Sequence, residues 1–278
     1  MVLRPLKKVA LPELSEQTGA AWLAELEAAL AAPGADRYRI ARDTLAGIYF
    51  PGVDVDRLLA DPRTPLATRS ALLALDPHHV TLEPEYYAEC DQAKFARVKP
   101  LLWLWYSFDR SPMGGQNVEL AVRFRRILAR HIFARCGKNF KAFQYVEFSF
   151  GYDMDVGDDV VVHRHVLLDD RGGITLGDRV SISDYANIYS HTHSIVDQKD
   201  VTSVRTILED DVRVTYHATV LAGVRVGRNG MVGAVAVATK DVRPFHVNVG
   251  IPAKSIRVKP NAPNDAVSTR RSGSEGIP

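Results

Sequence analysis

The amino-acid sequence predicts a parallel β-coil in the second half of the chain, preceded by an α-helical N-terminal region. Aliphatic residues recur every six positions from residue 156 onward, and small or β-branched residues recur with the same period four places later. The first half instead carries helix-forming residues at helical spacing. A period of six fits neither a helix nor an ordinary hairpin, so the repeating unit is a short strand followed by a turn.

The composition is that of an ordinary globular protein. Of 278 residues, 46% are hydrophobic and 24% are charged, which excludes bulk disorder, collagen and a polytopic membrane protein. The formal net charge of +2 gives no field that would attract nucleic acid or anionic lipid. The longest apolar run, 101–108, is far shorter than the ~20 residues that span a bilayer.

The cysteines and the N-terminus point to a reducing compartment. Cys90 and Cys136 have no metal-ligand spacing, and the first residues lack the apolar core of a secretion signal. We therefore expect a cytoplasmic protein with no membrane span and no nucleic-acid partner.

The helical region extends from residue 1 to 136. Apolar spacing and the Pro and Gly stops predict helices at about 14–32, 36–46, 65–75, 84–108 with a break near Pro100, and 117–135. The last helix has an apolar stripe flanked by arginines, which is compatible with a membrane-surface helix. We favour a helix that packs on the rest of the protein with its arginines in solvent, because the net charge is near zero and no lipidation motif accompanies it.

The repeat occupies residues 137–260, and a polar, Pro- and Ser-rich tail at 261–278 is expected to be disordered. Twelve aliphatic anchors share the six-residue phase: Val156, Val162, Leu168, Leu176, Ile182, Ile188, Leu208, Val214, Val220, Val226, Val232 and Ala238. The fourth-place column, expected to turn the corners, is Val160, Val166, Gly172, Val180, Ala186, Thr192, Val212, Ala218, Val224, Gly230, Ala236 and Val242. Three units per triangular coil would stack every anchor in a narrow interior, whereas a β-sandwich would alternate by two.

The same segment resembles a known enzyme family. Stretches such as FGYDMDVGDDV at 150–160, NIYSHTHS at 187–194 and VLAGVRVGRNGMVGAVAVATKDV at 220–242 are similar to the hexapeptide-repeat acyltransferases, most closely the galactoside and maltose O-acetyltransferases. The resemblance covers just under half of the chain. It implies a left-handed parallel β-helix, a homotrimer with sites between subunits, and acetyl-coenzyme A as acyl donor. The helical region is much longer than the start typical of that family, so its role is open.

Acyl transfer to a hydroxyl needs a base for the proton and donors for the oxyanion, and a neutral histidine suits the base role. His193 follows a strand directly before the 194–207 insertion, which is expected to project from the coil and close over a site. The resemblance matches it to the catalytic histidine of the family, so we expect His193 to be the general base rather than a solvated turn residue. His191 points the same way in an extended chain and is a supporting residue or has no role.

A column of rings is expected on one outer face, because His165, Tyr185 and His217 each stand three places after an anchor. This column is either a subunit interface or acceptor-pocket wall, or an ordinary exposed ladder.

Acetyl-coenzyme A needs small residues along a groove and cations for its phosphates. On the stretches that match the coenzyme-contacting parts of the family, we expect this role for Gly223, Gly233, Ala234, Thr239, Lys240, Lys254 and Arg257. The alternative is a solvated basic end of the coil.

The acceptor is a small molecule that the sequence does not identify. Arg164 stands where the family has an acceptor-binding asparagine, which argues for a phosphate or carboxylate on the acceptor. Asp169 and Asp170 are further candidates for hydroxyl contacts. No metal is expected, although a γ-class carbonic-anhydrase-like zinc protein and a non-catalytic trimeric scaffold remain alternatives, since the repeat contains five histidines.

Overall fold

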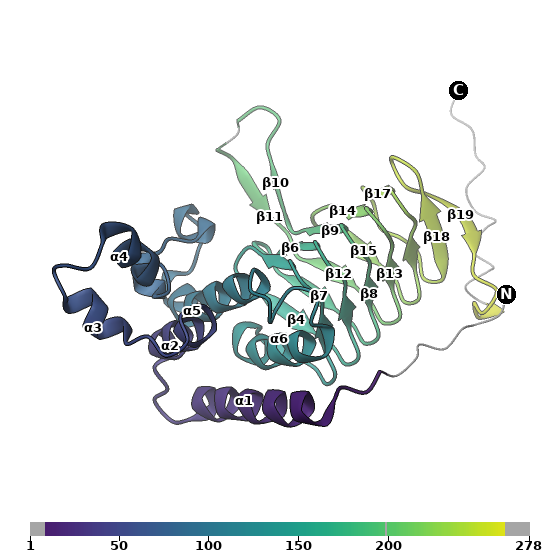
Figure 1. The fold of residues 1–278 in the computed structure, drawn as a ribbon. Coiled ribbons are helices and arrows are strands. Elements are labelled where there is room, and N and C mark those ends of the chain that lie inside the picture. Colours follow the sequence, from purple (N-terminus) through teal and green to yellow (C-terminus); the bar gives the residue numbers. More distant parts are fainter. Residues whose placement is uncertain (1–8, 198, 265–278) are drawn as a thin grey trace.

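Helices at the N-terminal end cover one end of a parallel β-coil, and a hairpin projects from the side of that coil (Figure 1). The computed structural model describes residues 9–197 and 199–264. Residues 265–278, most of the tail expected to be disordered, lie outside the described residues. The helices are α1 (Glu13–Ala31), α2 (Arg37–Tyr49), α3 (Val55–Ala60), α4 (Leu66–Leu73), η1 (Pro77–His79), η2 (Glu83–Tyr86), α5 (Gln92–Asp109) and α6 (Val118–Ile132).

The predicted helix at 84–108 is two elements. A short 3-10 helix, η2, is separated from α5 by an irregular stretch, and α5 begins where the Asp91 side chain accepts the N–H groups of Ala93 and Lys94. The predicted break near Pro100 is wrong, because α5 continues through this residue to Asp109. The missing proline N–H frees a carbonyl in the preceding turn, and the guanidinium of Arg37 donates to the nearby carbonyl of Arg97 at 2.9 Å.

The arginines of α6 face protein groups. Arg123 and Arg130 pair with Glu16 and Glu27 of α1, at 2.7 and 2.6 Å. The expectation that the arginines lie in solvent holds for the exposed Arg130 and is wrong for the buried Arg125. The ion pairs with α1 occupy the charges that a membrane surface would need. Within residues 9–197 and 199–264, none of the helices combines the length and the apolar character needed to span a bilayer.

A buried ion pair joins the helices to the coil. Arg125 of α6 and Asp109 of α5 are 1% and 2% exposed and lie 2.6 Å apart. Arg125 also donates to the carbonyls of Gly114 and Ala142, and Asp109 accepts the N–H of Tyr145 at 2.6 Å. Since Ala142 and Tyr145 belong to the first turn of the coil, removing either charge would leave its partner buried and unpaired.

Three parallel sheets form the sides of the coil. The strands are β1 (Arg135–Cys136), β2 (Lys141–Ala142), β3 (Glu147–Phe148), β4 (Met154–Val156), β5 (Val161–Val162), β6 (Leu167–Asp169), β7 (Ile174–Leu176), β8 (Ser181–Ile182), β9 (Asn187–Tyr189), β12 (Thr206–Leu208), β13 (Arg213–Val214), β14 (Thr219–Val220), β15 (Arg225–Val226), β16 (Met231–Val232), β17 (Val237–Ala238), β18 (His246–Val249) and β19 (Lys254–Val258). The first sheet has the strand order β1-β4-β7-β12-β15. The second sheet has the order β19-β18-β16-β13-β8-β5-β2, and the third sheet has the order β17-β14-β9-β6-β3. The hairpin strands β10 (His191–His193) and β11 (Val201–Ser203) pair antiparallel outside these sheets.

The predicted interior column is confirmed. All twelve anchors are at most 1% exposed. Each anchor pairs with the anchor of the next turn, as in the series Val156, Leu176, Leu208 and Val226. Burial of a side chain of this size contributes roughly 1.5–3 kcal/mol, so the column is the main apolar core of the coil.

The fourth-place column does not turn the corners. Except for the exposed Thr192 and the half-buried Gly172, its members are buried beside the anchors, and the residue before most of them has positive φ, as at Asp159, His165 and Gly223. At these corners, the residue three places after the anchor makes the bend through its left-handed backbone conformation. The residue after it then points inward, where only a small side chain fits. Thr192 is exposed because it lies on the hairpin strand β10.

A charge in the interior column should prevent the coil from forming. In Val226→Asp, a carboxylate would stand in a column without partners, at a cost comparable to the about 5–15 kcal/mol of total stability of a typical protein. Circular dichroism melts should show no cooperative transition for the coil, whereas Arg225→Ala, at an exposed neighbouring position, should melt within a few degrees of wild type. A wild-type melt for Val226→Asp would contradict the register.

Candidate active site

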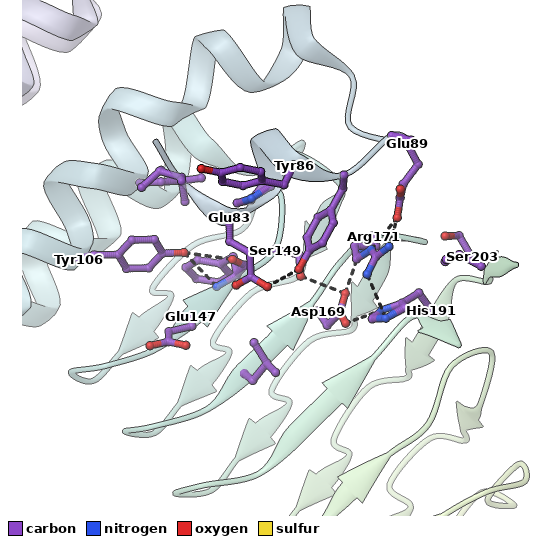
Figure 2. Close-up of a pocket in the computed structure, with 18 of the residues that line it drawn as sticks. Glu83, Tyr86, Glu89, Tyr106, Glu147, Ser149, Asp169, Arg171, His191 and Ser203 are labelled. Atoms are coloured by element: carbon purple, nitrogen blue, oxygen red, sulfur yellow. Dashed lines mark hydrogen bonds and ion pairs between the residues drawn. The ribbon is translucent and has the colours of Figure 1, made fainter. Parts of the chain in front are cut away.

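A cavity of about 1110 Å³ lies where the helical region, the third sheet and the hairpin meet (Figure 2). The helical region contributes the segment 82–89 and the end of α5. The coil contributes Glu147 of β3, Ser149 directly after that strand, and Asp169 of β6. Both His191 and His193 line the cavity from β10. Residues far apart in the sequence thus form one site.

His193 lies at the outer end of β10. Its backbone pairs with Val201 of β11, and its ring lies edge-on to the ring of His191 at 5.2 Å between centroids. The side chain is exposed and lines the cavity. The insertion does project from the coil, as the sequence predicted, in the form of a two-stranded hairpin (Figure 1). A histidine in this position can take a proton from a molecule bound in the cavity.

A charged side chain lies beside each ring nitrogen of His191. Nδ1 lies 2.5 Å from Oδ2 of Asp169, although the two are not aligned as a regular hydrogen bond. Nε2 lies 3.1 Å from Nη1 of Arg171. Burial, together with the charges of Arg171 and His193, lowers the pKa of His191 below its ordinary value and outweighs the carboxylate of Asp169. The neutral imidazole is therefore the favoured form.

Arg171, Glu89 and Tyr87 were not singled out from the sequence. Arg171 donates from Nε and Nη2 to Oε1 of Glu89, and its guanidinium lies 4.1 Å from the centre of the Tyr87 ring. Burial acts to raise the pKa of Glu89, but its own backbone N–H and Arg171 together lower it below the ordinary value. No sequence pattern connects residue 89 to residue 171, because only the packing of the helices on the coil brings them together.

The two aspartates at the 169–170 turn have different surroundings. Asp169 lines the cavity and accepts the hydroxyl of Ser149 at 3.0 Å. Asp170 is fully buried, does not line the cavity, and accepts the N–H groups of Phe150 and Asp153. Burial raises the pKa of Asp170 to about 6 against these hydrogen bonds. Asp170 therefore holds the neighbouring corner of the coil.

Arg164 and the ring column lie on another corner. Arg164 contacts Asp184 of the next turn at 3.2 Å and does not line the cavity. The rings of His165, Tyr185 and His217 stack with centroids 4.8 Å apart, so the predicted column is present. Tyr145 extends it by one turn at 4.8 Å and also lines the cavity.

None of the residues expected to bind the donor lines this cavity. Gly223 has φ +77° at a corner, and its N–H donates to Thr206. Gly233 and Ala234 follow β16, and Thr239 and Lys240 follow β17 on the exposed surface. Lys254 and Arg257 lie on β19, which pairs with β18 at the end of the coil. All seven lie toward the C-terminal end of the coil, away from the helices.

Metal ligands do not converge within the part of the chain that the structure describes. Among these residues, no group of three or more His, Cys, Asp or Glu side chains could hold a metal ion. The histidines of the coil instead stack on other rings or contact Asp169 and Arg171.

A parallel β-coil of hexads is the fold that this chain shares with solved hexapeptide-repeat acetyltransferases. No protein-family model matches the sequence. The chain is 27% identical over 140 residues to the galactoside O-acetyltransferase of Escherichia coli (strain K12), covering 49% of this chain and 69% of that protein.

Solved structures agree on the fold. A maltose O-acetyltransferase from Clostridium difficile 630 superposes with a TM-score of 0.53 at 24% identity, covering 63% of this chain and 91% of that one. A hexapeptide-repeat acetyltransferase from Vibrio cholerae O1 biovar eltor, solved with acetyl-coenzyme A, has a TM-score of 0.53 at 23% identity, covering 66% and 98%. The predicted left-handed β-helix and the resemblance to galactoside and maltose O-acetyltransferases are confirmed, and the enzyme class is acyltransferase.

The buried carboxyl of Asp170 should make stability depend on pH. The folded chain holds this proton up to a pKa of about 6 and the unfolded chain only up to the ordinary 3.8, so its contribution to the free energy of unfolding is largest below pH 4. That contribution falls by about 3 kcal/mol as pH rises through 6. Urea unfolding between pH 4 and 7 should show a flatter slope for Asp170→Asn. An unchanged slope in Asp170→Asn would contradict the assignment.

Proposed function

We propose that this protein is an acetyl-coenzyme A dependent O-acetyltransferase that modifies a hydroxyl of a sugar or sugar-like acceptor, with His193 as general base. The observation that carries the proposal is the cavity that joins His193 to a wall of carboxylates and hydroxyls, on a fold shared with acetyltransferases. The alternatives are a zinc hydratase and a scaffold. A hydratase would need metal ligands from several subunits, and a scaffold would not need a histidine facing a cavity.

The reaction can be written with this chain's own groups. His193 takes the proton of the acceptor hydroxyl as its oxygen attacks the carbonyl carbon of the acetyl thioester. The tetrahedral intermediate places negative charge on the carbonyl oxygen, which a backbone N–H at the site would stabilise. The carbon–sulfur bond then breaks, the acetyl ester remains on the acceptor, and the histidine returns its proton to the coenzyme A thiolate. No covalent enzyme intermediate is required.

The donor would lie along the third sheet. Its strand order places β9, which leads into His193, two strands from β17, which leads into Thr239 and Lys240. Neighbouring strands are separated by about 4.8 Å, so the two ends are roughly 10 Å apart across the sheet. Lys240, Lys254 and Arg257 would hold phosphates while the thioester reaches the hairpin. The acetyl-coenzyme A complex of the Vibrio cholerae structure supports this donor.

The acceptor is better matched by hydroxyl groups than by an anion. The cavity lining includes Glu83, Glu147, Asp169 and Ser149, which can accept or donate hydrogen bonds to a polyol. Arg164, expected from the sequence to favour a phosphate, contacts Asp184 outside this lining. A phosphate in the cavity would instead face an excess of carboxylates, so we propose a neutral sugar hydroxyl as acceptor.

A cytoplasmic homotrimer is the assembly that fits these proposals. Exposed rings at Tyr145, Tyr185 and Tyr216 run along one corner of the coil and offer a face on which a second copy can pack. Light scattering should give a mass near three times the 30.8 kDa of one chain.

Replacing His193 should abolish transfer without changing the fold. His193→Ala removes the only proposed proton acceptor, so kcat should fall at least 100-fold, consistent with the usual contribution of general-base catalysis. Thiol release from acetyl-coenzyme A, measured with a panel of sugars, and a thermal melt would check both parts. His78→Ala, an exposed histidine of the helical region beside Asp76, is the matched control. Near-normal turnover in His193→Ala would remove the assignment, and no thiol release from wild type would favour the scaffold.

Reversing the charge of Lys240 should weaken donor binding selectively. Lys240→Glu would repel the coenzyme A phosphates, so KM for acetyl-coenzyme A should rise about tenfold or more while KM for the acceptor changes little. Lys138→Glu, an exposed lysine at the opposite end of the coil, should leave both constants near wild type. A larger effect on the acceptor than on the donor would place the donor groove elsewhere.

A further inference from the structure

A chain of charged and polar groups crosses from the helical region to the hairpin. It begins at Glu89, passes through Arg171 and His191, and ends at Asp169, with the contacts drawn in Figure 2. Glu89 belongs to the segment between η2 and α5, Arg171 to a turn after β6, and His191 to β10. Three separate parts of the fold are therefore joined at this point.

Contacts with the helical region fix the side chain of Arg171. Its side chain is only 7% exposed, two of its nitrogens donate to Oε1 of Glu89, and Tyr87 covers its guanidinium. A planar guanidinium with several donors in fixed directions can hold a carboxylate and still direct another N–H elsewhere. Here the remaining nitrogen Nη1 faces Nε2 of His191. The orientation of Arg171 is thus set by two residues of the helical region.

The arginine determines the state of His191. An arginine has no acceptor, so Nε2 of His191 must offer its lone pair, and Nδ1 carries the hydrogen toward Asp169. Because the lone pair of Nε2 faces Arg171 and Nδ1 faces Asp169, His191 is unsuited to act as a base. The charged and titratable groups that face it from the surrounding elements are Asp169, Arg171, Glu89, Tyr189 and His193.

The position of His191 affects the proposed base directly. His193 stands two residues further along the same strand, on the same side, with its ring edge-on to that of His191. At the base of the hairpin, the backbone of His191 pairs with Ser203. A fixed His191 therefore restricts both the strand and the ring of His193, and misplacement of a reacting group by about 1 Å is costly in rate.

We propose that Arg171 is a positioning residue, through which Glu89 and Tyr87 of the helical region hold His191 neutral and keep the strand that bears His193 in its working orientation. This inference rests on the proposed role of His193, and it gives the long helical region a function in catalysis. The region forms a wall of the site and also fixes the hairpin opposite that wall.

The state of His191 can be measured without any turnover. Imidazole nitrogen spectra of the histidine-labelled full chain, assigned with His191→Gln, should show the Nδ1–H tautomer in wild type and protonation only below pH 6.5. In Arg171→Met the cation is gone and Asp169 remains, so the pKa of His191 should rise by at least one unit. Arg171→Lys keeps a charge beside the ring and should show a smaller rise. An Nε2–H tautomer in wild type, or identical titration in Arg171→Met, would overturn the proposal.

Kinetics test the consequence for the base. Arg171→Met and Glu89→Gln should lower kcat at least tenfold while KM for acetyl-coenzyme A stays within twofold, and Arg171→Lys should recover part of the loss. Arg135→Met, which breaks an exposed pair with Asp155 on the coil, is the matched control and should keep wild-type kcat. Unchanged kcat in both test variants would overturn the positioning role. A wild-type protein with no transfer would refute the proposed function, and the spectra would still decide whether Arg171 sets the state of His191.

Discussion

The stacking of aliphatic anchors in the coil interior is the constraint on which the rest of the structure depends. Each anchor pairs with the anchor one turn away. The remaining positions of the hexad therefore also lie directly above the equivalent positions of the neighbouring turn. The corner after the second sheet therefore becomes a stack of rings such as His165 and Tyr185, and another corner links Arg179 to Asp211. A regular apolar core thus produces aligned polar columns outside it.

The hairpin leaves the coil without breaking this stack because its base is closed by buried hydroxyls. Ser190 donates to the carbonyl of Asp169 at 2.6 Å and accepts the N–H of Gly172, and Thr206 donates to the carbonyl of Tyr189 at 2.6 Å. A side chain at Gly172 would meet the carbonyl of Ser190 at 2.2 Å, so only glycine permits the close approach of the two backbones. The polar groups freed by the departing strand are satisfied, as buried groups must be.

The helical region is part of the site rather than an appended module. The buried pair of Asp109 and Arg125 fixes α5 and α6 against the first turn of the coil, with a partner on the backbone of Tyr145. That fixed contact in turn determines where the segment 82–89 reaches the third sheet. The cavity volume, its carboxylate lining and the contact between Glu89 and Arg171 all depend on this docking.

The sequence by itself determined the coil, its register and the projecting insertion, because a hexad pattern has only one periodic way to bury all its anchors. It also singled out His193, His191 and Asp169, which strands β10 and β6 bring to one cavity. Only the tertiary structure decided that Asp170 faces the interior, that Arg164 meets Asp184 away from the cavity, and that Glu89 reaches Arg171. The physical reason is that periodicity fixes contacts between successive turns, whereas contacts between the helices and the coil depend on packing between segments with no shared period.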